Sequence, residues 1–170
     1  MGTILKNVWS HFEGFAFSVC SSRDTLFYFG GKTVAIYLKF GDKRVSIPKL
    51  QEFMVSGDVE AAKCLGRYYA KKRYSNPDLF ISCISCYTYG AKKGIAECMI
   101  NVSKYAAEYA CVLDNDNSVL KCQCIAMAND YAFMAIMTAR SENDRKHASK
   151  CMEVSQNLFY ENFDLMKVYR

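Results

Sequence analysis

Residues 86–98 read CYTYGAKKGIAEC, and an upstream stretch, residues 56–69, reads SGDVEAAKCLGRYY. When the two are aligned on Gly57 and Gly94, which are 37 residues apart, small and aliphatic residues recur at equal distances after each glycine. The matched pairs are Ala61 with Cys98, Leu65 with Val102, and Gly66 with Ser103. Small residues at a helix crossing let two backbones approach closely. A period of this length is typical of stacked helical hairpins.

The hydrophobic spacing beyond Pro48 predicts helices near residues 49–56, 58–71, 77–92, 95–113, 118–139 and 142–166. Their connectors hold only a few residues, so we expect successive helices to be antiparallel neighbours. Gly57 and Gly94 suit the left-handed turns between helices. Asn76 and Pro77 indicate a helix start, with Asn76 as the cap and Pro77 in the first turn.

Residues 13–48 alternate between apolar and other residues with a period of two. The segments around 15–19, 25–29, 33–40 and 45–47 predict three or four antiparallel strands with one apolar face. Gly30-Gly31 and the GDKR stretch supply the turns. The helices that follow are expected to cover the apolar face.

The fold class predicted is therefore α+β, with a small N-terminal antiparallel β-sheet followed by a mainly α-helical, solenoid-like bundle of hairpins. The sheet lobe spans residues 1–48 and the helical-repeat lobe residues 49–170. We expect the two lobes to form one cooperative unit.

The repeated stretch also resembles Sel-one-like repeats, a branch of the tetratricopeptide superfamily, over about residues 57–106. The residues that match that pattern are Tyr87, Gly90, Ala91 and Gly94 at the end of a second helix, and Ala61, Leu65, Gly66 and Tyr69 in a first helix. It departs from the pattern at Cys86, which replaces an aromatic residue, at Gly90, which replaces an alanine, and at Ala106, which replaces a tyrosine. The resemblance implies paired helices that bind another macromolecule.

Composition narrows the class of protein. With 170 residues, 51% of them hydrophobic, the chain can bury a core without disulfides. A net charge of +5 is low for a dedicated nucleic-acid binder. No secretory or membrane-spanning pattern occurs, and the nine cysteines are an odd number. We therefore expect a cytoplasmic protein with reduced thiols, in which the cysteines of helical patterns (Cys64, Cys83, Cys98, Cys111 and Cys151) act as small core residues.

Patterns that carry chemistry are weak. His147 and Cys151 have the spacing of a nucleophile and its base, and Cys83, Cys86, Cys122, Cys124 and His147 are the side chains from which a zinc site can be imagined. Packed helices are the favoured explanation of both sets. The DNDNSV stretch, residues 114–119, lacks the glycine and glutamate of a calcium loop. We expect no enzyme activity and no cofactor.

Cations and tyrosines gather in two short stretches, and this predicts a partner-binding surface. The residues assigned to it are Arg67, Tyr68, Lys71, Lys72, Arg73, Tyr74, Lys92 and Lys93. Such a mixture fits an acidic protein partner, and it also fits RNA through phosphate contacts and stacking. Basic residues that stabilise a helix end explain part of the same pattern.

The function favoured by these patterns is stoichiometric protein binding without catalysis. By type, the chain resembles bacterial immunity proteins, which bind and neutralise a cognate toxin domain, as in contact-dependent growth inhibition. The alternatives are an adaptor or secretion chaperone that binds an extended peptide, and an RNA-binding helical-repeat protein. Nucleic acid is the less favoured partner, and no membrane association is expected.

Overall fold

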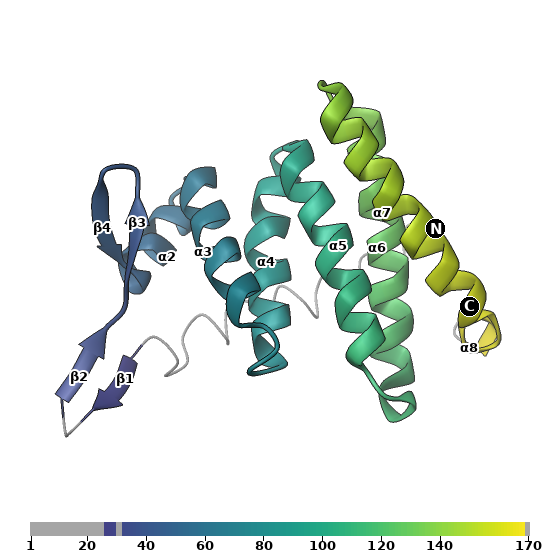
Figure 1. Cartoon of the computed structure of the whole chain (residues 1–170), viewed down its shortest axis with the longest axis horizontal. Coiled ribbons are helices and arrows are strands. Elements are labelled where there is room, and N and C mark those ends of the chain that lie inside the picture. The colour runs from purple at the N-terminus through teal and green to yellow at the C-terminus, as the bar shows by residue number, and fades with distance from the viewer. Residues whose placement is uncertain (1–25, 30–31, 169–170) are drawn as a thin grey trace. The chain divides into compact units, whose positions relative to one another are not determined.

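The computed structural model describes the backbone of residues 26–29 and 32–168, and the side chains from Ile36 onward except Asn115, Met166 and Val168. The chain is α+β, as predicted: short antiparallel strands precede a series of helices (Figure 1). Spatial contacts divide it into two compact units, residues 1–89 and 90–170, and each is described by itself. The lobe boundary predicted at residue 48 stays a prediction.

Four strands form two separate hairpins. β1 (Leu26–Phe29) pairs with β2 (Lys32–Ala35), and β3 (Tyr37–Phe40) pairs with β4 (Lys43–Ser46), both antiparallel. The single sheet and the unbroken strand predicted over 33–40 are therefore wrong. The break falls at Ile36, whose carbonyl accepts a hydrogen bond of 3.0 Å from the N–H of Ile47 at the start of a helix. The strand predicted around 15–19 lies outside the described residues.

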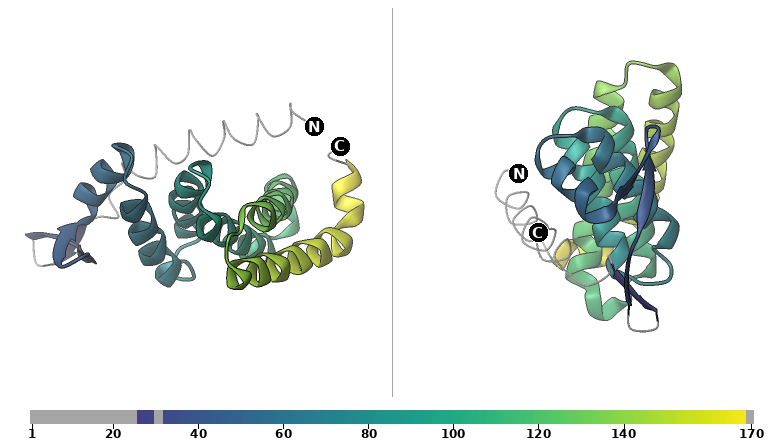
Figure 2. Two further views of the ribbon diagram at one scale, coloured as in Figure 1. Left: turned by 90° about the horizontal axis from the view of Figure 1, so that it is seen from above. Right: turned by 90° about the vertical axis from the view of Figure 1, so that its left-hand side faces the viewer.

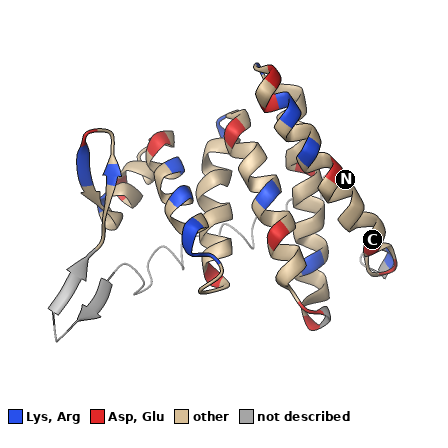
Figure 3. Ribbon diagram, viewed as in Figure 1, with Lys and Arg blue, Asp and Glu red and all other residues tan. Residues whose placement is uncertain are grey.

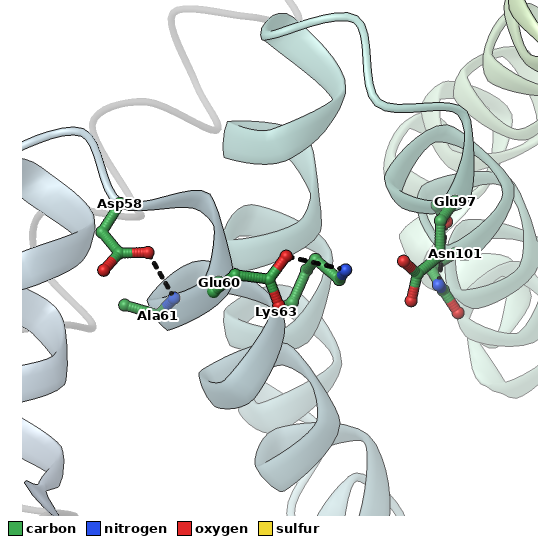
Figure 4. Close-up of polar contacts among 6 residues, drawn as sticks. All are labelled: Asp58, Glu60, Ala61, Lys63, Glu97 and Asn101. Atoms are coloured by element: carbon green, nitrogen blue, oxygen red, sulfur yellow. Dashed lines mark hydrogen bonds and ion pairs between the residues drawn. The ribbon is translucent and has the colours of Figure 1, made fainter. Parts of the chain in front are cut away.

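Three helices follow the hairpins in the first unit: α2 (Ile47–Val55), α3 (Val59–Lys72) and α4 (Asp78–Lys92), of which the last three residues belong to the second unit. The turn into α3 uses Gly57 at φ +114°, a conformation that glycine adopts at no steric cost. Asp58 then caps α3 by accepting a hydrogen bond of 3.1 Å from the N–H of Ala61 (Figure 4). The three helix predictions are confirmed to within two residues.

Helices α2 and α3 cover the β3–β4 hairpin, as predicted for the apolar face. The rings of Phe40 and Phe53 lie 6.1 Å apart, and the Cys64 thiol donates to the Lys39 carbonyl at 3.5 Å. Ile47 and Leu50 are fully buried on α2. The core of this unit therefore begins at the second hairpin.

Gly66 marks the closest approach of α3 to α4. A Cβ added at residue 66 would lie 2.8 Å from the ring of Tyr87, which is itself buried. The Cys83 thiol donates to the Gly66 carbonyl at 3.5 Å on the same side. Glycine is therefore needed here for packing, which is the role predicted for the small residues of the repeated stretch.

The second unit is a helical bundle: α5 (Ala96–Val112), the short η1 (Asn115–Asn117), α6 (Ser118–Thr138), α7 (Glu142–Glu161) and α8 (Phe163–Val168). Helices α5, α6 and α7 pack against one another, and Figure 2 shows them from above. The helix predicted over 142–166 is wrong in its length. Its first part ends at Glu161, where the backbone of Asn162 leaves the helical conformation and its side-chain amide donates to the Leu158 carbonyl.

The crossing of α5 and α6 also has a small residue at the point of contact, as the α3–α4 crossing does, but here the residue is a serine. Ser103, which the alignment pairs with Gly66, is fully buried and donates to the Ala128 carbonyl at 2.7 Å. The turn before α5 uses Gly94 at φ +80°. Cys98 and Val102, like their counterparts Ala61 and Leu65, are fully buried. The register predicted from the sequence thus matches the burial in both units, while membership of the repeat family stays a prediction.

Replacement of Gly66 by alanine is expected to destabilise the first unit, although alanine is the better helix former. The new Cβ would overlap the buried Tyr87 ring, and overpacking of this kind costs about 1–3 kcal/mol. The gain in helix propensity offsets about 1 kcal/mol. Denaturant unfolding of Gly66→Ala should therefore show a net loss of about 1 kcal/mol.

The control is the same substitution in a Tyr87→Leu background, where the smaller side chain removes the overlap and the cost of Gly66→Ala should shrink. A gain in the free energy of unfolding for the single variant would contradict the close approach.

Candidate protein-binding surface on α3

Helix α3 has one buried side and one basic side. Residues Ala61, Leu65, Gly66 and Tyr69 are buried. The opposite side carries Lys63, Arg67 and Lys71, which are spaced four residues apart and therefore align along the helix. Tyr68 and Lys72 form a second row beside them. Figure 3 marks the positions of Lys and Arg along α3 in blue. The basic surface predicted from the sequence is thus one side of a single helix.

Each tyrosine at this end of α3 has one of the chain's own cations beside its ring. The Lys72 ammonium lies 5.3 Å from the centroid of the Tyr68 ring, and the Arg73 guanidinium lies 4.4 Å from that of Tyr74. The Tyr74 ring in turn meets Phe80 edge to face, at 5.6 Å between centroids. Cation–π pairs at exposed sites contribute about 0.5–1 kcal/mol each, so these contacts hold the side chains in place before any partner arrives.

Arg73 also stabilises the end of α3. Its guanidinium donates to the Ala70 carbonyl and, at 3.2 Å, to the Tyr74 hydroxyl. The carbonyls of a last helical turn have no partner within the helix, and cations there interact favourably with the helix dipole. The helix-end explanation considered for the basic pattern therefore applies to Arg73.

Arg67 and Lys71 are exposed cations of this surface for which the described residues supply no acidic partner. Lys63, one turn earlier, forms an ion pair of 3.0 Å with Glu60 (Figure 4). Arg67 and Lys71 are exposed, and neither forms a hydrogen bond or ion pair with another residue that the structure describes. Two positive charges four residues apart are thus available to an external group. We call Arg67, Tyr68, Lys71, Lys72, Arg73 and Tyr74 the α3 surface.

Lys92 and Lys93 belong to the second unit, at the C-terminal end of α4 and just beyond it. Both are exposed. The structure therefore brings together six of the eight residues predicted to bind a partner, and it places the remaining two as a pair of their own. A binding site that joins the pair to the α3 surface stays a prediction.

Phe80 is a member of this region that sequence reasoning missed. It is buried at the start of α4, and the Arg73 guanidinium lies 5.9 Å from its ring centroid. The helix begins at Asp78, one residue later than predicted: the Pro77 carbonyl accepts the Phe80 N–H at 3.0 Å, and the Asn76 side chain accepts the Asp78 N–H at 3.0 Å. The signal in the sequence that could have located Phe80 is its position in the first turn of the helix after Pro77, which follows closely on Tyr74.

The cysteines considered for metal or redox chemistry lie inside helices. Cys83, Cys86, Cys122 and Cys124 are all buried. Within the part of the chain that the structure describes, no three His, Cys, Asp or Glu side chains are grouped to hold a metal ion. Burial raises the pKa of Cys124 to about 12, which disfavours the thiolate that metal binding and nucleophilic attack require.

The other two candidates have structural roles. The Cys151 thiol is directed at the Ile100 carbonyl, 3.9 Å away, and burial raises its pKa, whereas His147 is exposed. In the DNDNSV stretch the Asn117 amide donates to the Asp114 carboxylate at 2.6 Å, and α6 begins at the next residue. This is the inter-helix turn predicted, although Asn117 makes no capping bond through its side chain.

The prediction that Cys111 is a core residue is wrong, because Cys111 is exposed.

Comparisons of the chain with protein-family models, with curated proteins and with solved structures gave no significant match. Among the described helices, none combines the length and the apolar character needed to cross a bilayer. The geometry of the described residues is therefore the basis on which a function can be proposed.

Iodoacetamide added to the folded chain is expected to modify Cys111 and to leave Cys124 unmodified. Cys111 is exposed, whereas Cys124 is inaccessible and its thiolate is disfavoured by burial. Mass spectrometry of the digested chain over a time course measures both reactions. Both thiols should react in denaturant, and Cys111→Ser is the control for the native reaction. Rapid labelling of Cys83 or Cys86 in the native state would contradict their burial.

Proposed function

We propose that the chain is a non-catalytic binding protein and that its α3 surface docks on an acidic surface of a protein partner. The observation that carries the proposal is the exposed pair Arg67 and Lys71, beside tyrosines already held by Lys72 and Arg73. Arginine and tyrosine are enriched in protein interfaces. Side chains fixed before binding lose less entropy when the complex forms.

The charges and the rings have different roles in this proposal. Arg67 and Lys71 attract carboxylates on the partner, which raises the association rate and makes it sensitive to salt. Tyr74 is 70% exposed, and its ring offers a large rigid surface that the partner buries. The encounter is therefore governed by charge and the lifetime of the complex by aromatic burial.

A protein partner is favoured over RNA by the low net charge of the chain. Nucleic-acid binding draws on many cations that neutralise phosphates, whereas this chain has a net charge of +5. Arg67 and Lys71 suit the carboxylates of a small acidic patch on a protein.

The biological role we propose is that of an immunity protein, which binds a bacterial toxin domain in the cytosol and blocks it. A protein that masks an active site needs a complementary surface and no catalytic group of its own. The arrangement of helix pairs, compared with Sel-one-like and tetratricopeptide repeats on sequence grounds, provides such a surface. Fold alone does not fix function, so this role rests on the proposed docking of the α3 surface.

Reversal of both charges, Arg67→Glu with Lys71→Glu, is expected to weaken the complex about tenfold, because each exposed ion pair contributes up to about 1 kcal/mol. The immobilised chain captures its partner from a lysate of the source cells, and surface plasmon resonance with the purified partner then gives the Kd. The thermal midpoint should change little, since exposed substitutions usually alter stability by less than about 0.5 kcal/mol.

The matched control is Lys146→Glu with Lys150→Glu, an exposed pair of lysines at the same spacing on α7. It changes the net charge by the same amount and should leave the Kd unchanged. Equal weakening by both double variants would show a general charge effect and would contradict docking at α3.

Co-expression tests the biological role separately. A toxin domain encoded beside the gene for this chain is expected to arrest growth when produced alone, and the chain should restore growth. The Arg67→Glu, Lys71→Glu variant should restore it less well, because docking is weakened. Growth arrest that the wild-type chain does not relieve would refute the immunity role and leave the protein-binding proposal to the affinity measurement.

A further inference from the structure

Helix α6 is apolar on the side that faces its neighbours and also on the side that does not. Cys124, Ile125, Ala128 and Ala135 are fully buried in the bundle formed with α5 and α7. The exposed side carries large apolar residues as well: Val119 at 48%, Phe133 at 58%, Met134 at 43% and Met137 at 70% exposure. A helix that is hydrophobic all round is usually buried. In α6, by contrast, no described residue covers these exposed apolar side chains.

The exposed apolar residues lie on one side of the helix: Phe133, Met134 and Met137 are grouped near its C-terminal end, and Val119 lies near its start, with the half-buried Gln123 and Ala126 between. At 100° per residue, Val119, Asp130, Phe133, Met134 and Met137 fall within an arc of about 100°, and we call these five residues the α6 outer face. The half-buried Gln123 lies in the same arc. From Val119 to Met137 the face extends for about 27 Å along the helix axis. That length accommodates a helix of about 18 residues lying alongside.

Asp130 is the charged residue of this face. Asp130 is half-buried, and the apolar Phe133 and Met134 lie one turn further along the helix. It forms no hydrogen bond or ion pair with another residue in the described part of the chain. Burial raises the pKa of Asp130, because a carboxylate that loses water without gaining a cation is destabilised. The face therefore lacks a positive group at this point.

We propose that the α6 outer face binds an amphipathic helix of a partner protein, one that carries a single lysine or arginine within its apolar stripe, so that the cation meets Asp130. The apolar residues of the partner pack on Phe133 and Met137. Methionine side chains adapt their shape to different partners. This site is independent of the α3 surface, and it adds a second kind of contact to the proposed function.

A helix suits this face better than an extended peptide. An extended segment brings backbone N–H and C=O groups that need partners when they are buried. Apart from Asp130 and Gln123, the side chains of the face are apolar, and the backbone groups of α6 are already bonded within the helix. A helical partner satisfies its own backbone and presents side chains alone.

A second copy of the chain is a poorer occupant. In a symmetric antiparallel pair centred on the face, the two Asp130 carboxylates would lie within about 6 Å of each other along the axis. Two like charges would then share an apolar interface, to which the face supplies no cation. A membrane surface is poorer still, because the carboxylate would enter the hydrocarbon region.

The test uses the full chain and a set of synthetic helical peptides of about 18 residues with a leucine stripe. In each peptide one stripe position, scanned through the middle of the sequence, holds Arg, Leu or Glu. Fluorescence anisotropy gives the Kd. We expect the best Arg peptide to bind at least about tenfold more tightly than its Leu and Glu counterparts.

Substitutions in the chain locate the site. Asp130→Asn, a change of nearly equal shape, should abolish the preference for Arg, and the Leu peptide should bind more tightly because no unpaired carboxylate is then desolvated. Met137→Asp should weaken all the peptides. The matched control is Tyr160→Asp on α7, a residue that is 72% exposed, which should change nothing. Circular dichroism confirms that each variant is folded.

Three outcomes would overturn the proposal. One is the absence of any binding tighter than about 1 mM. The second is an Arg preference that persists in Asp130→Asn. The third is a dimer, measured by light scattering, that Met137→Asp dissociates, since a second copy would then occupy the face. A failure of the α3 proposal would leave these measurements unaffected, because none of the substitutions touches α3.

Discussion

The close approach of paired helices at a small residue is the constraint on which the described structure depends. At the α3–α4 crossing, Gly66 leaves room for the Tyr87 ring, and at the α5–α6 crossing, Ser103 fits because its hydroxyl bonds to the Ala128 carbonyl. Helices this close bury mainly alanines and cysteines between them. Many large side chains are consequently placed elsewhere, and several tyrosines, phenylalanines and methionines remain on the outside, where a partner can reach them.

The two candidate surfaces differ in the physical term that governs binding. On the α3 surface the cations are solvated and the rings are already engaged, so the first contribution is long-range attraction, which salt screens. On the α6 outer face the main contribution is the removal of apolar surface from water, about 25 cal/mol for each Å², and salt has little effect on it. The α3 surface therefore favours fast association, whereas the α6 outer face favours slow dissociation.

Sequence periodicity predicted the helices well because most of them have one polar and one apolar side, and because Gly57, Gly94 and Pro77 mark their limits. It did not predict the break at Ile36, since a backbone hydrogen bond to Ile47 leaves no trace in the side-chain pattern. Six residues of the α3 surface were predicted from composition alone. The α6 outer face was missed because a helix that is apolar on all sides has no contrast to reveal which side is open.

Asp130 explains how such an apolar face can still be selective. Replacement of its carboxylate by a leucine would make the face a better binder of any apolar helix, and it would also invite association between copies of the chain. The carboxylate penalises every occupant that arrives without a cation, because it is then desolvated and unpaired. An occupant with a cation at the matching position avoids that penalty and gains a charged hydrogen bond. Discrimination between partners thus comes from the cost imposed on the wrong ones more than from the strength of the right contact.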